Sequence, residues 1–82
     1  MKKWYVYILE CKDGKLYTGI TNDLERRVKQ HNRGQGCKFT RFRTPVMLIH
    51  NEIYPSRVLA LKREAEIKGW PRKKKLRLQV TV

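Results

Sequence analysis

The chain has 82 residues, which is enough for one small domain and too few for two. Its composition is 40% hydrophobic, and 20 Lys and Arg residues against 7 Asp and Glu give a net charge of +13. This charge excludes an acidic protein and favours a polyanionic partner, such as nucleic acid or an anionic surface. Because no stretch approaches the ~18 apolar residues of a membrane span, we expect a single cytoplasmic domain over residues 1–82 with no membrane partner.

The order of strand and helix signals predicts an α/β (α+β) domain. Aromatic and β-branched residues favour strands, whereas apolar residues at helical spacing behind a capping residue favour helices. We expect, in chain order, strands over residues 4–9 and 16–20, a helix over 22–32 capped by Asn22, a helical turn within 34–44, a strand over 46–54, a helix over 56–69 and a basic helical turn after Pro71.

The first two strands are separated by a hairpin signal, KDG at residues 12–14. A two-residue loop would place Tyr7 and Tyr17 on opposite faces of the sheet. A three-residue loop with Gly14 in the left-handed conformation would pair Tyr7 with Gly19 and make the two tyrosines diagonal neighbours on one face. The pattern alone permits both loop lengths.

The first helix carries two polar residues on its apolar side. Leu24, Arg27, Val28 and His31 share an arc of about 100° on a helical wheel, so Arg27 and His31 lie one turn apart on the face that packs inward. Arg26 points to the opposite side. A histidine at this position is also explained by the negative end of the helix dipole.

The second long helix contains two acids in different surroundings. Glu64 falls inside an apolar arc beside Ala60, whereas Glu66 falls with Lys62 and Arg63 on the charged side. Glu64 is therefore the functional candidate, although it could also pair with the lysine one turn later.

Five inward polar side chains from separate elements form a candidate site that we expect to converge on one face of the sheet. They are two phenols, a guanidinium, an imidazole and a carboxylate: Tyr7, Tyr17, Arg27, His31 and Glu64. A carboxylate can hold a divalent metal ion, and the metal and an arginine can stabilise a pentavalent phosphate. A phenol or imidazole can move the proton of an attacking water. These groups suit phosphodiester hydrolysis.

The same residues resemble the motifs of the GIY-YIG nuclease family. YVY at residues 5–7 stands where the family has Gly-Ile-Tyr, and YTG at residues 17–19 stands for Tyr-Ile-Gly. RVKQH at residues 27–31 is similar to the family's Arg-x-x-x-His helix, and ALKRE at residues 60–64 to its metal-binding Glu helix. The resemblance spans residues 4–76, and the length resembles that of the small stand-alone bacterial members.

The resemblance implies a three-stranded antiparallel sheet flanked by helices, and it favours the three-residue loop because both tyrosines belong to the family's active site. It implies a DNA endonuclease in which Tyr17, aided by His31 or Tyr7, helps to activate water. Arg27 would then stabilise the phosphate, and Glu64 would bind one Mg²⁺ or Mn²⁺ ion.

Two stretches of the chain are strongly basic. Residues 26–43 hold seven basic residues and no acid, and residues 57–77 hold nine basic residues and two acids. A solvated surface would explain the charge, but the interleaved aromatic residues are typical of a phosphate-backbone interface. We expect backbone contacts, to DNA more than to RNA, from Lys38, Arg41, Arg43, Arg72, Lys73 and Lys75. Because no base-reading pattern is present, substrate structure should direct binding more than sequence.

Two further interpretations remain open. Many family members carry an Asn near the end of the domain, and residues 65–82 contain none. The chain could therefore be a non-catalytic nucleic-acid-binding module that keeps the fold and the basic surface. Its charge alone would also allow an RNA-binding or ribosome-associated protein.

Overall fold

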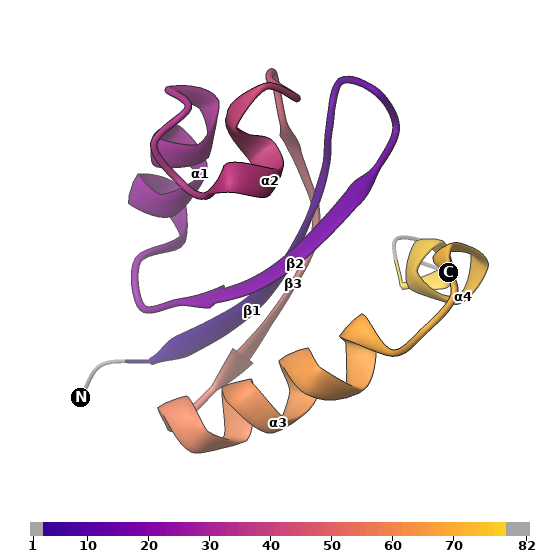
Figure 1. Cartoon of the computed structure of the whole chain (residues 1–82). Helices are drawn as coiled ribbons and strands as arrows, with labels where there is room; N and C mark the ends of the chain where they lie inside the picture. Colours follow the sequence, from indigo (N-terminus) through magenta and orange to yellow (C-terminus); the bar gives the residue numbers. More distant parts are fainter. Residues whose placement is uncertain (1–2, 79–82) are drawn as a thin grey trace.

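A computed structural model of the chain describes residues 3–78. Three antiparallel strands form one sheet in the order β2-β1-β3, with helices on both of its faces (Figure 1). The elements are β1 Trp4–Glu10, β2 Leu16–Thr21, α1 Leu24–Asn32, α2 Lys38–Arg41, β3 Met47–Tyr54, α3 Arg57–Lys68 and α4 Arg72–Arg77. The predicted α+β class and chain order are confirmed. Within the described residues, no helix combines the length and apolar character that a membrane span requires.

The β1–β2 hairpin turns through the three-residue loop. Leu9 pairs with Tyr17, and Tyr7 pairs with Gly19. Gly14 has a φ of +84°, in the left-handed region that glycine enters without a steric penalty. The longer of the two possible loops is therefore correct, and both tyrosines lie on the same face of the sheet.

Alternation along β1 gives the sheet two different faces. The fully buried Val6 and Ile8 pack with residues of α3, whereas Tyr7 and Leu9 point the other way, into a core shared with α1. Figure 1 shows α1 and α2 on one side of the sheet and α3 on the other. The face of the sheet that a candidate side chain reaches therefore depends on the layer from which it comes.

α1 begins one residue later than the sequence predicts, because its N-cap is Asp23 and not Asn22. The Asp23 carboxylate accepts a hydrogen bond from the Arg26 N–H at 3.1 Å. The Thr21 hydroxyl accepts from the Asp23 N–H at 3.1 Å and donates to the Asp23 carbonyl at 3.2 Å, which holds the turn before the helix. The predicted outward direction of Arg26 is confirmed, and the helix ends at Asn32 as expected.

Candidate active site

A chain of hydrogen bonds connects Tyr7 with the core beneath α1 and α2. Tyr7 and His31 are fully buried, and the Tyr7 hydroxyl lies 2.9 Å from His31 Nε2. His31 Nδ1 lies 2.7 Å from the hydroxyl of the buried Thr40, which donates to the Cys37 carbonyl at 3.4 Å. Arg27 Nε donates to the Tyr7 oxygen at 3.4 Å. We call Tyr7, Arg27, His31 and Thr40 the Tyr7 network.

The hydrogen-bond partners of His31 indicate where its proton lies. With the proton on Nδ1, His31 donates to Thr40 and its Nε2 accepts from the Tyr7 hydroxyl, so every donor in the Tyr7 network faces an acceptor. Burial, followed by the charge of Arg27, lowers the pKa of His31 to about 4. Burial also raises the pKa of Tyr7, and the hydrogen bond from Arg27 only partly offsets this effect. At neutral pH the pair is thus a neutral phenol donating to a neutral imidazole.

Two glycines allow the backbone to approach these rings. A Cβ atom on Gly19 would lie 2.6 Å from the Tyr7 hydroxyl oxygen, and one on Gly36 would lie 2.2 Å from His31 Nδ1. The Gly36 carbonyl also accepts a hydrogen bond from Arg27 Nη2 at 3.1 Å. Any larger residue at either position would push the hydrogen-bonded rings apart.

Tyr17 is the phenol that reaches the surface. Its ring centroid lies 6.2 Å from that of Tyr7 and 5.1 Å from that of His31. On the other side it stacks with Phe39 at 5.9 Å. Burial, followed by the neighbouring Tyr7 and Cys37, raises the pKa of the half-buried Tyr17 hydroxyl, which is therefore protonated at neutral pH.

Arg27 is also half-buried at this surface. Its Nη1 donates to Gln30 Oε1 at 3.2 Å, which together with the Gly36 contact holds the guanidinium beside the Tyr7 hydroxyl. The structure therefore brings together four of the five predicted residues, Tyr7, Tyr17, Arg27 and His31, on the α1 face of the sheet.

Glu64 comes from a helix on the other face of the sheet, so the five candidate residues do not all project from one face. Glu64 belongs to α3, which packs on the other face together with Ala60 and Ile67. Its side chain is 17% exposed, and its carboxylate lies 3.6 Å from Lys68 Nζ. The helical wheel recognised an inward residue but could not tell which side of the sheet the helix would cover.

The Glu64 side chain nevertheless turns toward one edge of the sheet. At about 100° per residue, Arg63 and Glu64 lie on opposite sides of the buried line through Ala60 and Ile67. Arg63 turns toward β3, where it contacts Glu52, so Glu64 turns toward the edge strand β2. Its charge contributes to raising the pKa of Tyr7, which lies under Gly19 of the same strand. The candidate site therefore extends around the edge of β2.

Comparison with known proteins identifies the family. The model of a GIY-YIG catalytic domain matches residues 3–77. The chain belongs to the GIY-YIG family. The match confirms the resemblance drawn from YVY, YTG and the two helices. The family is nuclease-type, and its nucleases generally use divalent metal ions.

Relatives of similar length carry the name UPF0213. One from Staphylococcus saprophyticus is 53% identical over 78 residues, or 95% of each chain. One from Haloquadratum walsbyi is 58% identical over 74 residues, which are 90% of this chain and 83% of that protein.

Two solution NMR structures have a similar fold. A UPF0213 protein from Bacillus halodurans has a TM-score of 0.59 at 49% identity, with 93% of this chain and 81% of that chain covered. A protein from E. faecalis has a TM-score of 0.63 at 40% identity, with 96% and 85% covered.

The donor set of this GIY-YIG chain suits a metal ion held jointly with substrate. Within residues 3–78, no three His, Cys, Asp or Glu side chains gather as a metal site. Glu64 is the carboxylate that the sequence offers for such an ion, and Mg²⁺ commonly binds through one or two carboxylates with water and substrate phosphate as its other ligands. The residues fit such an ion if Glu64 leaves its pairing with Lys68.

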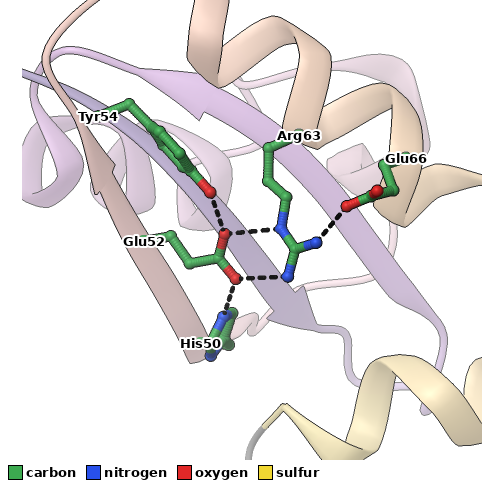
Figure 2. Close-up of polar contacts among 5 residues, drawn as sticks. All are labelled: His50, Glu52, Tyr54, Arg63 and Glu66. Carbon is green, nitrogen blue, oxygen red and sulfur yellow. Dashed lines mark hydrogen bonds and ion pairs between the residues drawn. The ribbon is translucent and has the colours of Figure 1, made fainter.

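A second polar network occupies the α3 face of this GIY-YIG domain (Figure 2). Glu52 Oε1 accepts from Tyr54 at 2.7 Å and Arg63 Nε at 2.8 Å, and Oε2 accepts from His50 at 2.8 Å and Arg63 Nη2 at 3.1 Å. Arg63 also donates to Glu66. Burial alone would raise the pKa of Glu52, but the hydrogen bonds from Arg63, His50 and Tyr54 outweigh it and lower the pKa to about 2. We call these residues the Glu52 network.

The Glu52 network corrects the predicted position of Arg63. The sequence places Arg63 on the charged outer side of its helix, yet the side chain is only 25% exposed and holds α3 against β3. The correction has a tertiary cause, because the buried carboxylate that attracts Arg63 comes from another element.

The six predicted nucleic-acid contacts divide into two groups. Arg43 and Arg72 are engaged within the chain: Arg43 pairs with Asp13 at 3.0 Å, and Arg72 donates to the Gly14 carbonyl. The other four are exposed or half-buried on the two short helices: Lys38 and Arg41 on α2, and Lys73 and Lys75 on α4.

Sequence reasoning missed Gly36 and Thr40, and it counted Phe39 only among the aromatic residues interleaved with the basic ones. Gly36 and Thr40 contact His31, and Phe39 stacks on Tyr17. All three lie in the connection around α2, where neither strand nor helix periodicity indicates a direction. The signals that residues 36–44 do carry are basic charge and interleaved aromatic residues, and neither indicates a contact with His31.

Proposed function

We propose that the chain is a metal-dependent endonuclease that hydrolyses DNA phosphodiester bonds and is directed by substrate structure rather than sequence. The observation that carries this proposal is the contact of Tyr7, Arg27 and His31 in one hydrogen-bonded network, with Tyr17 at its surface. The net charge of +13 supports an anionic polymer as substrate, and the nuclease-type family supports the reaction.

Each member of the site has a role that follows from its surroundings. Arg27 presents a half-buried guanidinium, which can bind and neutralise a phosphate oxygen as charge develops. Tyr17 is the accessible phenol and would orient the attacking water. His31 is fully buried and acts through Tyr7, whose proton its Nε2 can accept while the Tyr7 oxygen takes a proton from the surface. His31 and Thr40 are thus positioning residues.

Glu64 would hold one Mg²⁺ or Mn²⁺ ion at the edge of β2. When bound, such an ion polarises a phosphate oxygen and stabilises the leaving oxygen. Lys68 would release Glu64 and remain near the phosphate as a second positive charge.

The test is a cleavage assay on single-stranded, duplex, nicked and branched DNA in Mg²⁺, Mn²⁺ or EDTA. Wild type is compared with Tyr17→Phe, Arg27→Ala and Glu64→Ala from parallel preparations. Matched controls are Arg26→Ala and Glu66→Ala, which remove the same charges from exposed positions of the same two helices. We expect metal-dependent cleavage that falls at least about 100-fold in the three site variants and stays near wild type in the controls.

Two outcomes contradict the proposal. Cleavage that persists in all three site variants would come from a contaminating nuclease. Folded protein that binds DNA without cleaving any substrate in either metal would instead be a non-catalytic module with an inherited site.

A further inference from the structure

A basic groove follows the hairpin end of β2, beside Tyr17. It is lined by residues 13–16 of the hairpin, by Phe39 of α2 and by Arg72 and Lys75 of α4, and it has a volume of about 420 Å³. Figure 1 shows the hairpin turn with α2 on one side and α4 on the other. Because β2 is an edge strand, no other strand of residues 3–78 pairs with its outer side.

The charge of the groove is positive. Lys15 and Lys75 line it without an ion pair of 4 Å or less among the described residues. The one acid in its wall, Asp13, is neutralised by Arg43 at 3.0 Å. Arg72 donates to the Gly14 carbonyl and lies 3.8 Å from Glu10, so it joins α4 to the hairpin. Two lysines are therefore available for an anionic ligand, while Arg43 and Arg72 make contacts within the chain.

An aromatic wall joins the groove to the candidate active site. Phe39 is 37% exposed, lines the groove and stacks on Tyr17 with ring centroids 5.9 Å apart. The Arg43 guanidinium lies 4.4 Å from the centre of the Phe39 ring and adds a flat cationic surface. A ligand in the groove would thus lie next to a group bound at Tyr17.

We propose that this groove binds a single-stranded segment of DNA that continues from the phosphate held at Tyr17 and Arg27. The volume lies in the range of roughly 300–1,000 Å³ that is typical of small-molecule sites, so a nucleotide-sized group fits within the groove. Basic grooves with aromatic side chains are the common means of binding single strands. The position of the cleaved phosphate rests on the proposed nuclease function, whereas binding in the groove does not require cleavage.

Fluorescence anisotropy in EDTA tests the groove without cleavage. A labelled oligothymidylate and a blunt duplex of equal length are titrated with wild type and with two matched pairs of variants. Lys75→Glu is paired with Lys74→Glu, since Lys74 is on the same helix but its Nζ lies 4.3 Å from the centre of the Trp70 ring. Phe39→Ala is paired with Phe42→Ala, since Phe42 is 86% exposed and does not line the groove.

We expect Lys75→Glu and Phe39→Ala each to weaken binding of the single strand by roughly tenfold. Their partners should weaken it by less than about threefold, and the duplex should show no such difference within a pair. Thermal unfolding checks that every variant is folded. If Phe39→Ala fails to fold, because Phe39 packs on Tyr17, the lysine pair on α4 still decides the question.

Equal weakening within both pairs would overturn the proposal, because it would indicate diffuse charge rather than a groove. A larger effect of the groove variants on an oligouridylate than on DNA would also overturn it, with RNA as the occupant. The cleavage assay on wild type separates this proposal from the nuclease: groove-dependent binding by a wild type that does not cleave supports the groove and refutes the enzyme.

Discussion

The two faces of the sheet carry polar networks of opposite character. In the Glu52 network, a carboxylate accepts four hydrogen bonds and Arg63 is shared between two acids, so the charged groups are paired within the chain. The Tyr7 network is built around a neutral phenol and a neutral imidazole, with one cation, Arg27, at the surface. The first network joins two elements, whereas the second ends beside Tyr17 where a ligand can bind.

This difference shows why a perturbed pKa alone is a poor guide to function. The lowered pKa of Glu52 has a sufficient structural cause in its hydrogen bonds from Arg63, His50 and Tyr54. A saturated carboxylate has no lone pair left for a metal or a proton transfer. By contrast, the one ion pair of Glu64 among residues 3–78 is with Lys68, whose side chain is exposed.

The largest expected effect comes from breaking the Tyr7 network at Gly19. In Gly19→Ala the new Cβ would lie 2.6 Å from the Tyr7 oxygen, so the ring and its bond to His31 must move. We expect a loss of about 3 kcal/mol in the free energy of unfolding, measured by urea denaturation. Gly69→Ala is the control, because its Cβ would meet nothing closer than 3.5 Å and the change should stay within about 0.5 kcal/mol. Equal stability of the two variants would contradict the packing described.

Acidification should destabilise the two networks in different pH ranges. The pKa of His31 falls from its ordinary 6.5 to about 4 on folding, so its contribution is complete above pH 6.5 and is lost as the pH falls to 4. The pKa of Glu52 falls from 4.5 to about 2, so its contribution is lost between pH 4.5 and 2.

Urea denaturation at a series of pH values separates the two ranges, each of which should remove at most roughly 3 kcal/mol. In His31→Gln the decline between pH 6.5 and 4 should disappear, while the lower range remains. A wild-type stability that does not change between pH 6.5 and 4 would show that His31 is not held neutral.

The smallest effect concerns Thr18, between Tyr17 and Gly19 in the second motif. Among the described residues, its hydroxyl is the buried side-chain polar group without a hydrogen-bond partner, and the residue is 3% exposed. Thr18→Val should therefore raise the free energy of unfolding by about 1 kcal/mol. Thr21→Val should lower it by a similar amount, because the Thr21 hydroxyl makes two hydrogen bonds with Asp23. A loss of stability in Thr18→Val would mean that its hydroxyl has a partner in solution.

The periodicity of the sequence predicted those side-chain directions that depend on a single helix or hairpin. The inward direction of Arg27 and His31 follows from the helical repeat, and the pairing of Tyr7 with Gly19 follows once the loop length is known. The side of the sheet that Glu64 occupies depends on how the chain crosses from β3 to α3, which no repeat encodes.

Contacts between distant segments were beyond the sequence for the same reason. The partner of Arg63 lies eleven residues earlier on β3, and Thr40 reaches His31 from an irregular connection. In each case a side chain's direction became clear only when a second element supplied the group that it contacts.

The contrast between a structural and a catalytic carboxylate is tested most directly by Glu64→Gln and Glu52→Gln, with cleavage and unfolding measured on both. Each substitution replaces a carboxylate by an amide of the same shape. We expect Glu64→Gln to lose at least about 100-fold in cleavage with the free energy of unfolding changed by less than about 0.5 kcal/mol. Glu52→Gln should lose about 2 kcal/mol of stability and, while folded, cleave within about threefold of wild type. Undiminished cleavage by Glu64→Gln, or its loss in folded Glu52→Gln, would contradict the assignment of Glu52 to structure and Glu64 to catalysis.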